Sequence, residues 1–209
     1  MPSMPLSLAG WQQSSRIYGC RPDDHGHIGK LVHVGHPATS AMRVKSFAGM
    51  RCSIAGALEA VGDRWAFLIL RDLSLGLRRF DDFQHSALIP TTTLARRLKH
   101  LQKTGLIEKT LYRGNPPRFE YRLTLKGREF VLVLIALMQW GDRWNVSGAG
   151  GPPVIPVSRE SHHRVKLALL DSTSGQQISL DRIIPRTGAG ADKTVRWRLS
   201  RANAYGCDA

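Results

Sequence analysis

Residues 91–125 read TTTLARRLKHLQKTGLIEKTLYRGNPPRFEYRLTL, a basic helical segment followed at once by two strand-like segments. Leu94, Leu98 and Leu101 are spaced i, i+4 and i+7, which predicts a buried stripe on a helix from Thr91 to Thr104. At about 100° per residue, five polar positions point away from that stripe. They are Thr92, Arg96, Lys99, His100 and Lys103. Because no acidic residue lies in the predicted helix 91–104, its outward face is cationic.

A two-stranded wing is predicted after Gly105, which ends the basic helix. Residues 106–112 and 118–124 alternate apolar and polar side chains and are rich in β-branched and aromatic residues. Between them, residues 113–117 (RGNPP) form a strong turn signal. We call residues 106–124 the wing. It carries two arginines at its turn, Arg113 and Arg118.

Helices are predicted on both sides of this segment. Periodic apolar residues indicate helices at 54–61, 63–76 and 79–87, with Asp63 as an N-cap, and a last helix at 125–144 begins after the N-cap Thr124. This order is that of a winged helix-turn-helix, a mainly α fold with a small β wing. In that fold the basic helix enters the DNA major groove, and the wing crosses phosphates or the minor groove.

The last helix predicts a homodimer. Its segment 130–138, FVLVLIALM, is apolar on every side and therefore has to be covered all round. A domain this small covers one face only, so we expect a second copy of the chain to cover the other. The predicted dimer-interface residues lie on this helix and on the first one: Ile54, Leu58, Val131, Leu134 and Met138.

Composition changes along the chain divide it into four parts. Residues 1–50 are rich in Pro, Gly, Ser and His without periodicity, so we expect a disordered N-terminal tail and a start codon assigned too early. Residues 51–146 form the winged domain. Residues 147–185 are interpreted as a linker and a small β-like appendage, and residues 186–209 as a disordered C-terminal tail.

The charge of the chain favours a polyanionic partner. It contains 30 Lys and Arg against 16 Asp and Glu, a formal net charge of +14. Three cysteines are too few and too scattered for a disulfide-stapled secreted domain, so a reducing cytoplasm is expected. The longest apolar segment is too short for a membrane span, and the start of the chain lacks a secretory signal pattern.

Double-stranded DNA is the predicted partner of the basic helix and the wing. The alternative is that these charges form an ordinary solvated surface. Lys and Arg neutralise phosphates, and Arg also donates two hydrogen bonds to guanine. The predicted contact residues are Arg79, Thr91, Thr92, Thr93, Arg96, Arg97, Lys99, Lys103, Arg113 and Arg118. Which residues of the helix read bases stays open.

Seven motifs in register over residues 50–145 resemble the HxlR-type bacterial transcriptional regulators. They are CSIAGAL (52–58), GDRWAFLILRDLSLG (62–76), RRFDDF (78–83), IPTTTLARRL (89–98), LQKTGLIE (101–108), PPRFEYRLTL (116–125) and KG (126–127). The resemblance implies a dimeric DNA-binding repressor or activator that responds to electrophiles, oxidants or small metabolites. It also implies a redox-sensing role for Cys52, against the alternative of a small side chain packed at a dimer contact.

The appendage resembles a degenerate zinc knuckle of some relatives. Its matching positions, Ser161-His162-His163 and Asp171 to Gly175, lack three cysteines of such a site, so we expect no structural zinc and no cofactor. No nucleophile elbow or phosphate-binding glycine loop is present, which argues against an enzyme. The sequence predicts a sequence-specific transcriptional regulator. The alternative is a nonspecific basic protein that binds nucleic acid in a structural role.

Overall fold

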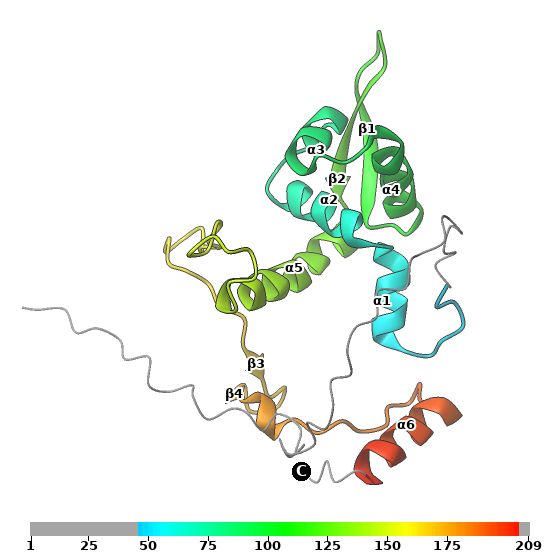
Figure 1. Ribbon diagram of the computed structural model, residues 1–209, viewed down its shortest axis with the longest axis vertical. Coiled ribbons are helices and arrows are strands. Elements are labelled where there is room, and N and C mark those ends of the chain that lie inside the picture. The colour runs from blue at the N-terminus through cyan, green and yellow to red at the C-terminus, as the bar shows by residue number, and fades with distance from the viewer. Residues whose placement is uncertain (1–45, 205–209) are drawn as a thin grey trace, which may run out of the picture. The chain divides into compact units, whose positions relative to one another are not determined.

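The computed structural model describes residues 46–204, drawn in colour in Figure 1. Contacts group these residues into two compact units, Ser46–Leu167 and the segment from Ala168 onward. The expected N-terminal tail lies outside the described residues as far as residue 45. The predicted winged domain, residues 51–146, falls within the first unit.

The first unit has the order of elements that the sequence predicts. These are α1 (Ser53–Val61), α2 (Arg64–Ser74), α3 (Phe80–Ala87), α4 (Thr91–Lys103), β1 (Ile107–Arg113), β2 (Arg118–Leu123) and α5 (Leu125–Arg143). Strands β1 and β2 pair antiparallel, and the tip of the wing projects from the unit (Figure 1). The mainly helical winged fold is thus confirmed.

Capping groups begin and end the helices where the local sequence predicts. The Asp63 carboxylate accepts hydrogen bonds from the N–H groups of Trp65 and Ala66, the first orphan donors of α2. The Thr124 hydroxyl accepts from Gly127 N–H at 3.2 Å. Gly62 ends α1 at a φ of 101°, a backbone conformation that glycine adopts without a steric penalty.

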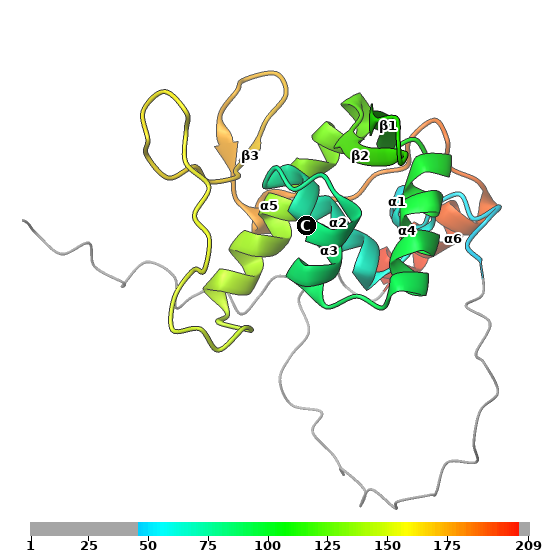
Figure 2. The same ribbon diagram turned by 90° about the horizontal axis from the view of Figure 1, so that it is seen from above.

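One hydrophobic core lies between α2, α3, α4 and the sheet, which are close together in Figures 1 and 2. The predicted stripe of α4, Leu94, Leu98 and Leu101, is fully buried in it. Tyr121 N–H on β2 donates to the Arg78 carbonyl oxygen at 2.8 Å, which ties the wing to the chain before α3. The core therefore holds both α4 and the base of the wing in place.

Gly127 permits a close approach between α5 and the chain before β1. A Cβ atom at Gly127 would lie 2.0 Å from the Leu106 carbonyl oxygen, which also accepts from Thr124 N–H at 3.2 Å. We expect Gly127→Ala to lower the free energy of unfolding by about 1–3 kcal/mol or more, since the helix has to move and strain these contacts. Urea unfolding followed by circular dichroism measures the loss.

Gly141→Ala is the matched control for this change, because Gly141 lies in the same helix. Its added Cβ atom would make an ordinary contact of 3.4 Å with Val146. We expect a neutral or slightly stabilising effect, since alanine favours a helix interior over glycine. Equal stability of Gly127→Ala and the wild-type protein would contradict the proposed constraint.

The second unit is only partly as expected. It contains β3 (Leu169–Leu170), β4 (Gln177–Ile178), the short 3₁₀ helix η2 (Leu180–Arg182) and α6 (Lys193–Ala204). The apolar runs expected to form β structure contribute only a two-residue ladder between β3 and β4, and one isolated bridge joins Val157 and Arg164 of the first unit.

Helix α6 corrects the expectation of disorder for residues 193–204. The segment is polar and basic, which suggested a tail, yet Arg, Lys, Leu and Ala are all good helix formers. The Asp192 carboxylate accepts from Val195 N–H at 2.9 Å and so satisfies a donor at the start of the helix. Within residues 46–204, no helix combines the length and the apolar character that a membrane span needs.

Candidate nucleic-acid interface

The exposed face of α4 carries a row of polar and cationic side chains. Thr92, Arg96, Lys99 and Lys103 are all exposed, and we call them the cationic stripe. At about 100° per residue these four positions fall within roughly 60° of arc, opposite the buried leucines. Since α4 contains no acidic residue, nothing on the helix itself neutralises the stripe. This arrangement suits an anionic surface that runs along the helix.

Arg97 does not belong to that exposed face, although the sequence analysis included it among the DNA contacts. Its guanidinium forms an ion pair with the Asp63 carboxylate, the cap of α2, and its side chain is 22% exposed. The structure therefore gives Arg97 a role in holding α4 against the start of α2. Sequence position alone did not separate it from Arg96, its neighbour.

The other polar side chains of α4 lie outside the cationic stripe, and two of them bond to neighbouring helices. The Thr91 hydroxyl accepts a hydrogen bond from Gln84 Nε2 at 2.9 Å and so links α4 to α3. Thr93 is half-buried. His100, which the helical pattern placed on the outward face, points toward α1, where its Nε2 lies 3.2 Å and 3.1 Å from the carbonyl oxygens of Glu59 and Ala60.

The wing places two cations at its tip. Arg113 and Arg118 are exposed and face each other across the β1–β2 ladder, beside a register irregularity. Lys109 Nζ lies 3.7 Å from the centre of the Phe119 ring, so a third cation is held along the same ladder. The sequence analysis missed Lys109, which pairs with Tyr121 in the ladder and reaches Phe119 diagonally across it. The tip thus carries side chains of like charge, which repel one another and whose repulsion a bound anion would relieve.

Arg79 connects the wing with α3. Its guanidinium carbon lies 5.0 Å from the centre of the Tyr112 ring on β1, and the backbone N–H of Arg79 donates to the Asp82 carboxylate at 3.2 Å. Arg79 remains exposed at the N-terminus of α3. The predicted contact residues Arg79, Arg96, Lys99, Lys103, Arg113 and Arg118 are therefore all exposed in the first unit.

The exposed apolar surface of this unit lies on α1 and α5. Ile54 and Leu58 on α1 are 72% and 43% exposed. On α5 the exposed side chains include Leu132, Val133, Leu137 and Trp140. An open hollow of about 270 Å³ lies between the two helices and is lined by apolar side chains of both, including Ala57 and Val133. We call this region the α1–α5 surface.

The three interface residues predicted on α5 are not its most exposed ones. Val131 and Met138 are half-buried, and Leu134 packs against the core of its own unit, as does Phe130. The outer face is formed instead by Leu132, Val133, Leu137 and Trp140. Because every position from 130 to 138 is apolar, the sequence contained no polar residue that would mark the outer side.

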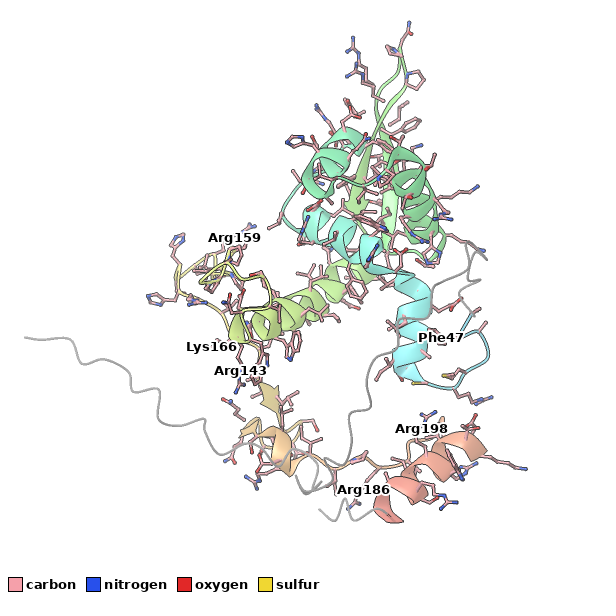
Figure 3. The ribbon with its side chains drawn as sticks, viewed as in Figure 1. Phe47, Arg143, Arg159, Lys166, Arg186 and Arg198 are labelled. Carbon is pink, nitrogen blue, oxygen red and sulfur yellow. The ribbon has the colours of Figure 1, made fainter. Side chains whose placement is uncertain are left out.

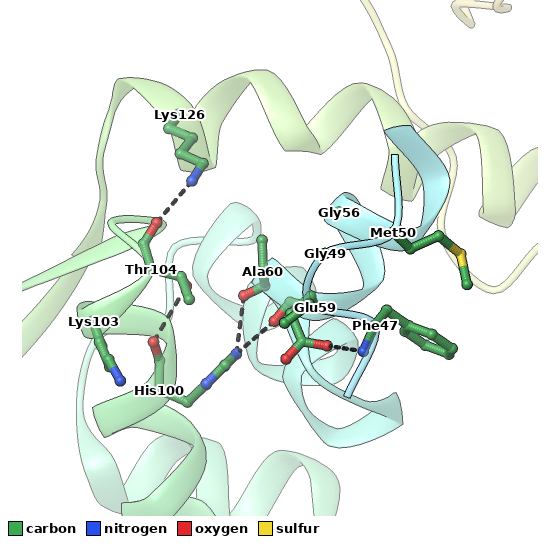
Figure 4. Close-up of a pocket in the computed structure, with 11 residues that line it drawn as sticks. Phe47, Gly49, Met50, Gly56, Glu59, Ala60, His100, Lys103, Thr104 and Lys126 are labelled. Atoms are coloured by element: carbon green, nitrogen blue, oxygen red, sulfur yellow. Dashed lines mark hydrogen bonds between the residues drawn. The ribbon is translucent and has the colours of Figure 1, made fainter. Parts of the chain in front are cut away.

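A strap of residues 46–50 crosses α1 close to the end of α4 (Figure 4). The Glu59 carboxylate accepts hydrogen bonds from Phe47 N–H at 3.0 Å and from the Ser46 hydroxyl at 2.8 Å. These bonds, the one from Phe47 foremost, lower the pKa of Glu59 below its ordinary value. An open hollow of about 480 Å³ lies beside the strap, and His100, Lys103 and Lys126 are among its lining residues.

Cys52 is the N-cap residue of α1 and is half-buried. A redox-sensing role at this position stays a prediction, as does the alternative of packing at a dimer contact.

In the appendage, the Asp171 carboxylate accepts hydrogen bonds from the Ser174 and Thr173 N–H groups, and these bonds lower the pKa of Asp171. Within residues 46–204, no group of three or more His, Cys, Asp or Glu side chains is placed to hold a metal ion.

Comparison with known proteins identifies the family. A model of the HxlR-like helix-turn-helix family matches residues 60–148. A protein of Mycobacterium tuberculosis, named as an uncharacterized HTH-type transcriptional regulator, is 36% identical over 138 residues, which cover 66% of this chain and 87% of the relative. The chain belongs to the HxlR-like helix-turn-helix family. An HTH-type regulator of Methanothermobacter thermautotrophicus is 39% identical over 96 residues, covering 44% of this chain and 72% of the relative.

Two solved structures resemble this HxlR-like protein. PA1374 of Pseudomonas aeruginosa, described as a candidate transcription factor, is 38% identical with a TM-score of 0.50, and the match covers 71% of this chain and 100% of that one. PA1607, described in the same terms, is 32% identical with a TM-score of 0.57, covering 68% and 100%. The relatives are named as transcriptional regulators, and none of these comparisons indicates an enzyme family.

Proposed function

We propose that this HxlR-like protein binds operator DNA sequence-specifically as a homodimer and regulates transcription in the cytoplasm. The observation that carries the proposal is the cationic stripe of α4, four exposed positions on one side of a helix that the core holds rigidly. In a winged helix-turn-helix this helix enters the major groove. Arg96 lies in the middle of the stripe, where a side chain reaches base edges, and Lys99 and Lys103 meet phosphates.

The wing contacts the sugar-phosphate backbone in this proposal. Arg113 and Arg118 lie at its projecting tip, and neither has an acidic partner among the described ion pairs. Arg79 lies at the N-terminus of α3, where backbone N–H groups also favour a phosphate. Phosphate contacts position the protein and add affinity without reading sequence.

The dimer forms through the α1–α5 surface. Two copies related by a twofold axis bring the same patch of each together, and the exposed Leu132, Leu137 and Trp140 are covered in both. Exposed apolar patches of this kind mark interaction sites in proteins. A dimer places two α4 helices on one duplex, which predicts an operator made of two related half-sites.

A mobility-shift titration on the DNA upstream of the gene tests sequence specificity. Unlabelled operator and random duplexes compete for the protein at physiological salt. A regulator prefers its site over random DNA by about 10³-fold or more. A ratio near one would instead support the alternative, a nonspecific nucleic-acid-binding protein.

Arg113→Ala tests the part played by the wing. We expect it to weaken binding to operator and random DNA by about the same factor, since a phosphate contact is independent of sequence. The slope of log affinity against log salt becomes shallower by about 0.9 for each phosphate that the variant no longer neutralises, and in a dimer two phosphates are affected. Titrations at several salt concentrations measure both effects. A weakening confined to the operator would show that Arg113 reads bases.

A further inference from the structure

Helix α6 is strongly basic, although it lies beyond residues 60–148 that the family model matches. Its twelve residues include Lys193, Arg196, Arg198 and Arg201 and no acidic residue. The carboxylate of Asp192, which directly precedes α6 in the sequence, is engaged at the N-terminus of the helix through Val195 N–H. In the part of the chain that the structure describes, no ion pair involves a cation of α6.

The two sides of α6 differ in exposure. Val195, Leu199 and Ala202 are half-buried and lie within about 60° of arc on one side. The remaining side carries the cations together with an aromatic ring, and all its members are exposed: Lys193, Arg196, Trp197, Arg198 and Arg201. Arg198 is labelled on the helix in Figure 3, with Arg186 on the chain before it. The four cations and Trp197 thus spread over the roughly 200° of arc that remains outside the half-buried side.

We propose that the exposed face of α6 is a second DNA-binding surface, which contacts the phosphate backbone of the duplex and reads no bases. The proposal rests on the proposed function, because DNA bound by α4 brings α6 to a high local concentration of phosphate. Arginine suits this role, since its planar guanidinium donates two parallel hydrogen bonds to a phosphate. Trp197, 60% exposed among these cations, adds a flat surface that packs against sugars.

An acidic membrane surface is the other polyanion that a basic helix binds, but α6 fits it less well. A helix that lies in a membrane interface inserts a bulky apolar face opposite its cations. In α6 that side contains two larger aliphatic side chains and an alanine, all half-buried, and the one large aromatic residue lies among the cations. The arrangement therefore favours a surface contact with phosphates over insertion into lipid.

The test is a full-length variant that carries Arg196→Gln, Arg198→Gln and Arg201→Gln. We expect its Kd to rise about tenfold or more at 0.1 M salt, by the same factor on operator and random duplexes. The slope of log affinity against log salt should become shallower by about 2–5, because as many as six phosphates of the duplex are no longer neutralised by a dimer. Circular dichroism and sedimentation confirm that fold and oligomeric state are kept.

The control variant removes the same charge elsewhere in the C-terminal half: Arg159→Gln, Arg164→Gln and Lys166→Gln, three exposed residues without a described ion pair. A smaller rise in Kd than that of the α6 variant supports the proposal, whereas equal rises overturn it, since net charge alone then explains them. Wild-type binding to phosphatidylserine vesicles that the α6 variant loses, with unchanged DNA binding, also overturns it. If the wild type fails to prefer its operator, the proposed function fails while the α6 comparison on random duplex still holds.

Discussion

Leu137→Arg should convert the protein into a folded monomer whose affinity for operator DNA is at least about 100-fold lower. Leu137 is 50% exposed on α5, so an arginine there is compatible with the fold of a single chain. In the proposed dimer the same position is covered by the second copy, and an unpaired charge at such a contact is costly. A monomer engages one half-site, and the affinity gain from linking two half-sites, about 10² to 10⁴, is absent.

Leu134→Arg should act differently, although it lies only one turn away. Leu134 packs against the core of its own unit, so the substitution should lower the free energy of unfolding of each chain by about 2–4 kcal/mol. Analytical ultracentrifugation at micromolar concentration separates the two outcomes when it is combined with urea unfolding. A folded, monomeric Leu134→Arg protein would contradict the inner position of this residue.

Leu75→Arg is the control for the dimer prediction, because Leu75 is 58% exposed as the C-cap residue of α2 and is not among the residues that form the α1–α5 surface. This variant should stay folded and dimeric. If the wild-type protein sediments as a monomer, or if Leu137→Arg remains a dimer, α5 is not the interface.

Arg96→Ala and Arg97→Ala, two adjacent substitutions, should separate DNA binding from stability. Arg96 is exposed on the cationic stripe, so its removal should leave stability unchanged and cost about 1–3 kcal/mol of binding free energy per half-site. The base preference at one position of each half-site should relax. Binding to a panel of operators with single base changes identifies that position.

Arg97→Ala should mainly destabilise the fold. Its guanidinium pairs with Asp63, and both side chains are less than one-third exposed. Removing it leaves the Asp63 carboxylate with only the backbone donors of α2, and we expect a decrease of about 1–3 kcal/mol in the free energy of unfolding. Once folded, this variant should retain its base preference.

The prediction for Arg96 has its own contradicting outcome. Equal decreases in affinity for operator and random DNA in the Arg96→Ala variant would show that Arg96 only positions the helix.

Local chemistry accounts for what the sequence predicted well. Asp63 and Thr124 cap their helices through donors two or three residues away, so neighbouring residues are sufficient to place the helix starts. The buried stripe of α4 follows from leucine spacing alone. The order of helices and strands, the wing and the family resemblance are all confirmed on this basis.

The C-terminal segment shows where local signals misled. Its polar, basic composition indicated disorder, yet α6 forms with Asp192 as an acceptor at its start. Helix propensity is high in this segment, but it lacks the clear apolar period from which the other helices were predicted. The appendage shows the opposite error. Apolar and polar residues alternate there as in strands, yet β3 and β4 form only a two-residue ladder.

Within residues 51–146, the sequence by itself determined which residues are helical, which strands pair and which helix is cationic, because capping, periodicity and turn chemistry act between residues close in the chain. Only the tertiary structure decided which of Arg96 and Arg97 faces outward, since the two are chemically identical and the choice depends on the Asp63 carboxylate brought up by α2. The same holds for α5. Its nine apolar residues carry equal hydrophobic signals, and the packing of Phe130 and Leu134 on the core alone selects the face left for a partner.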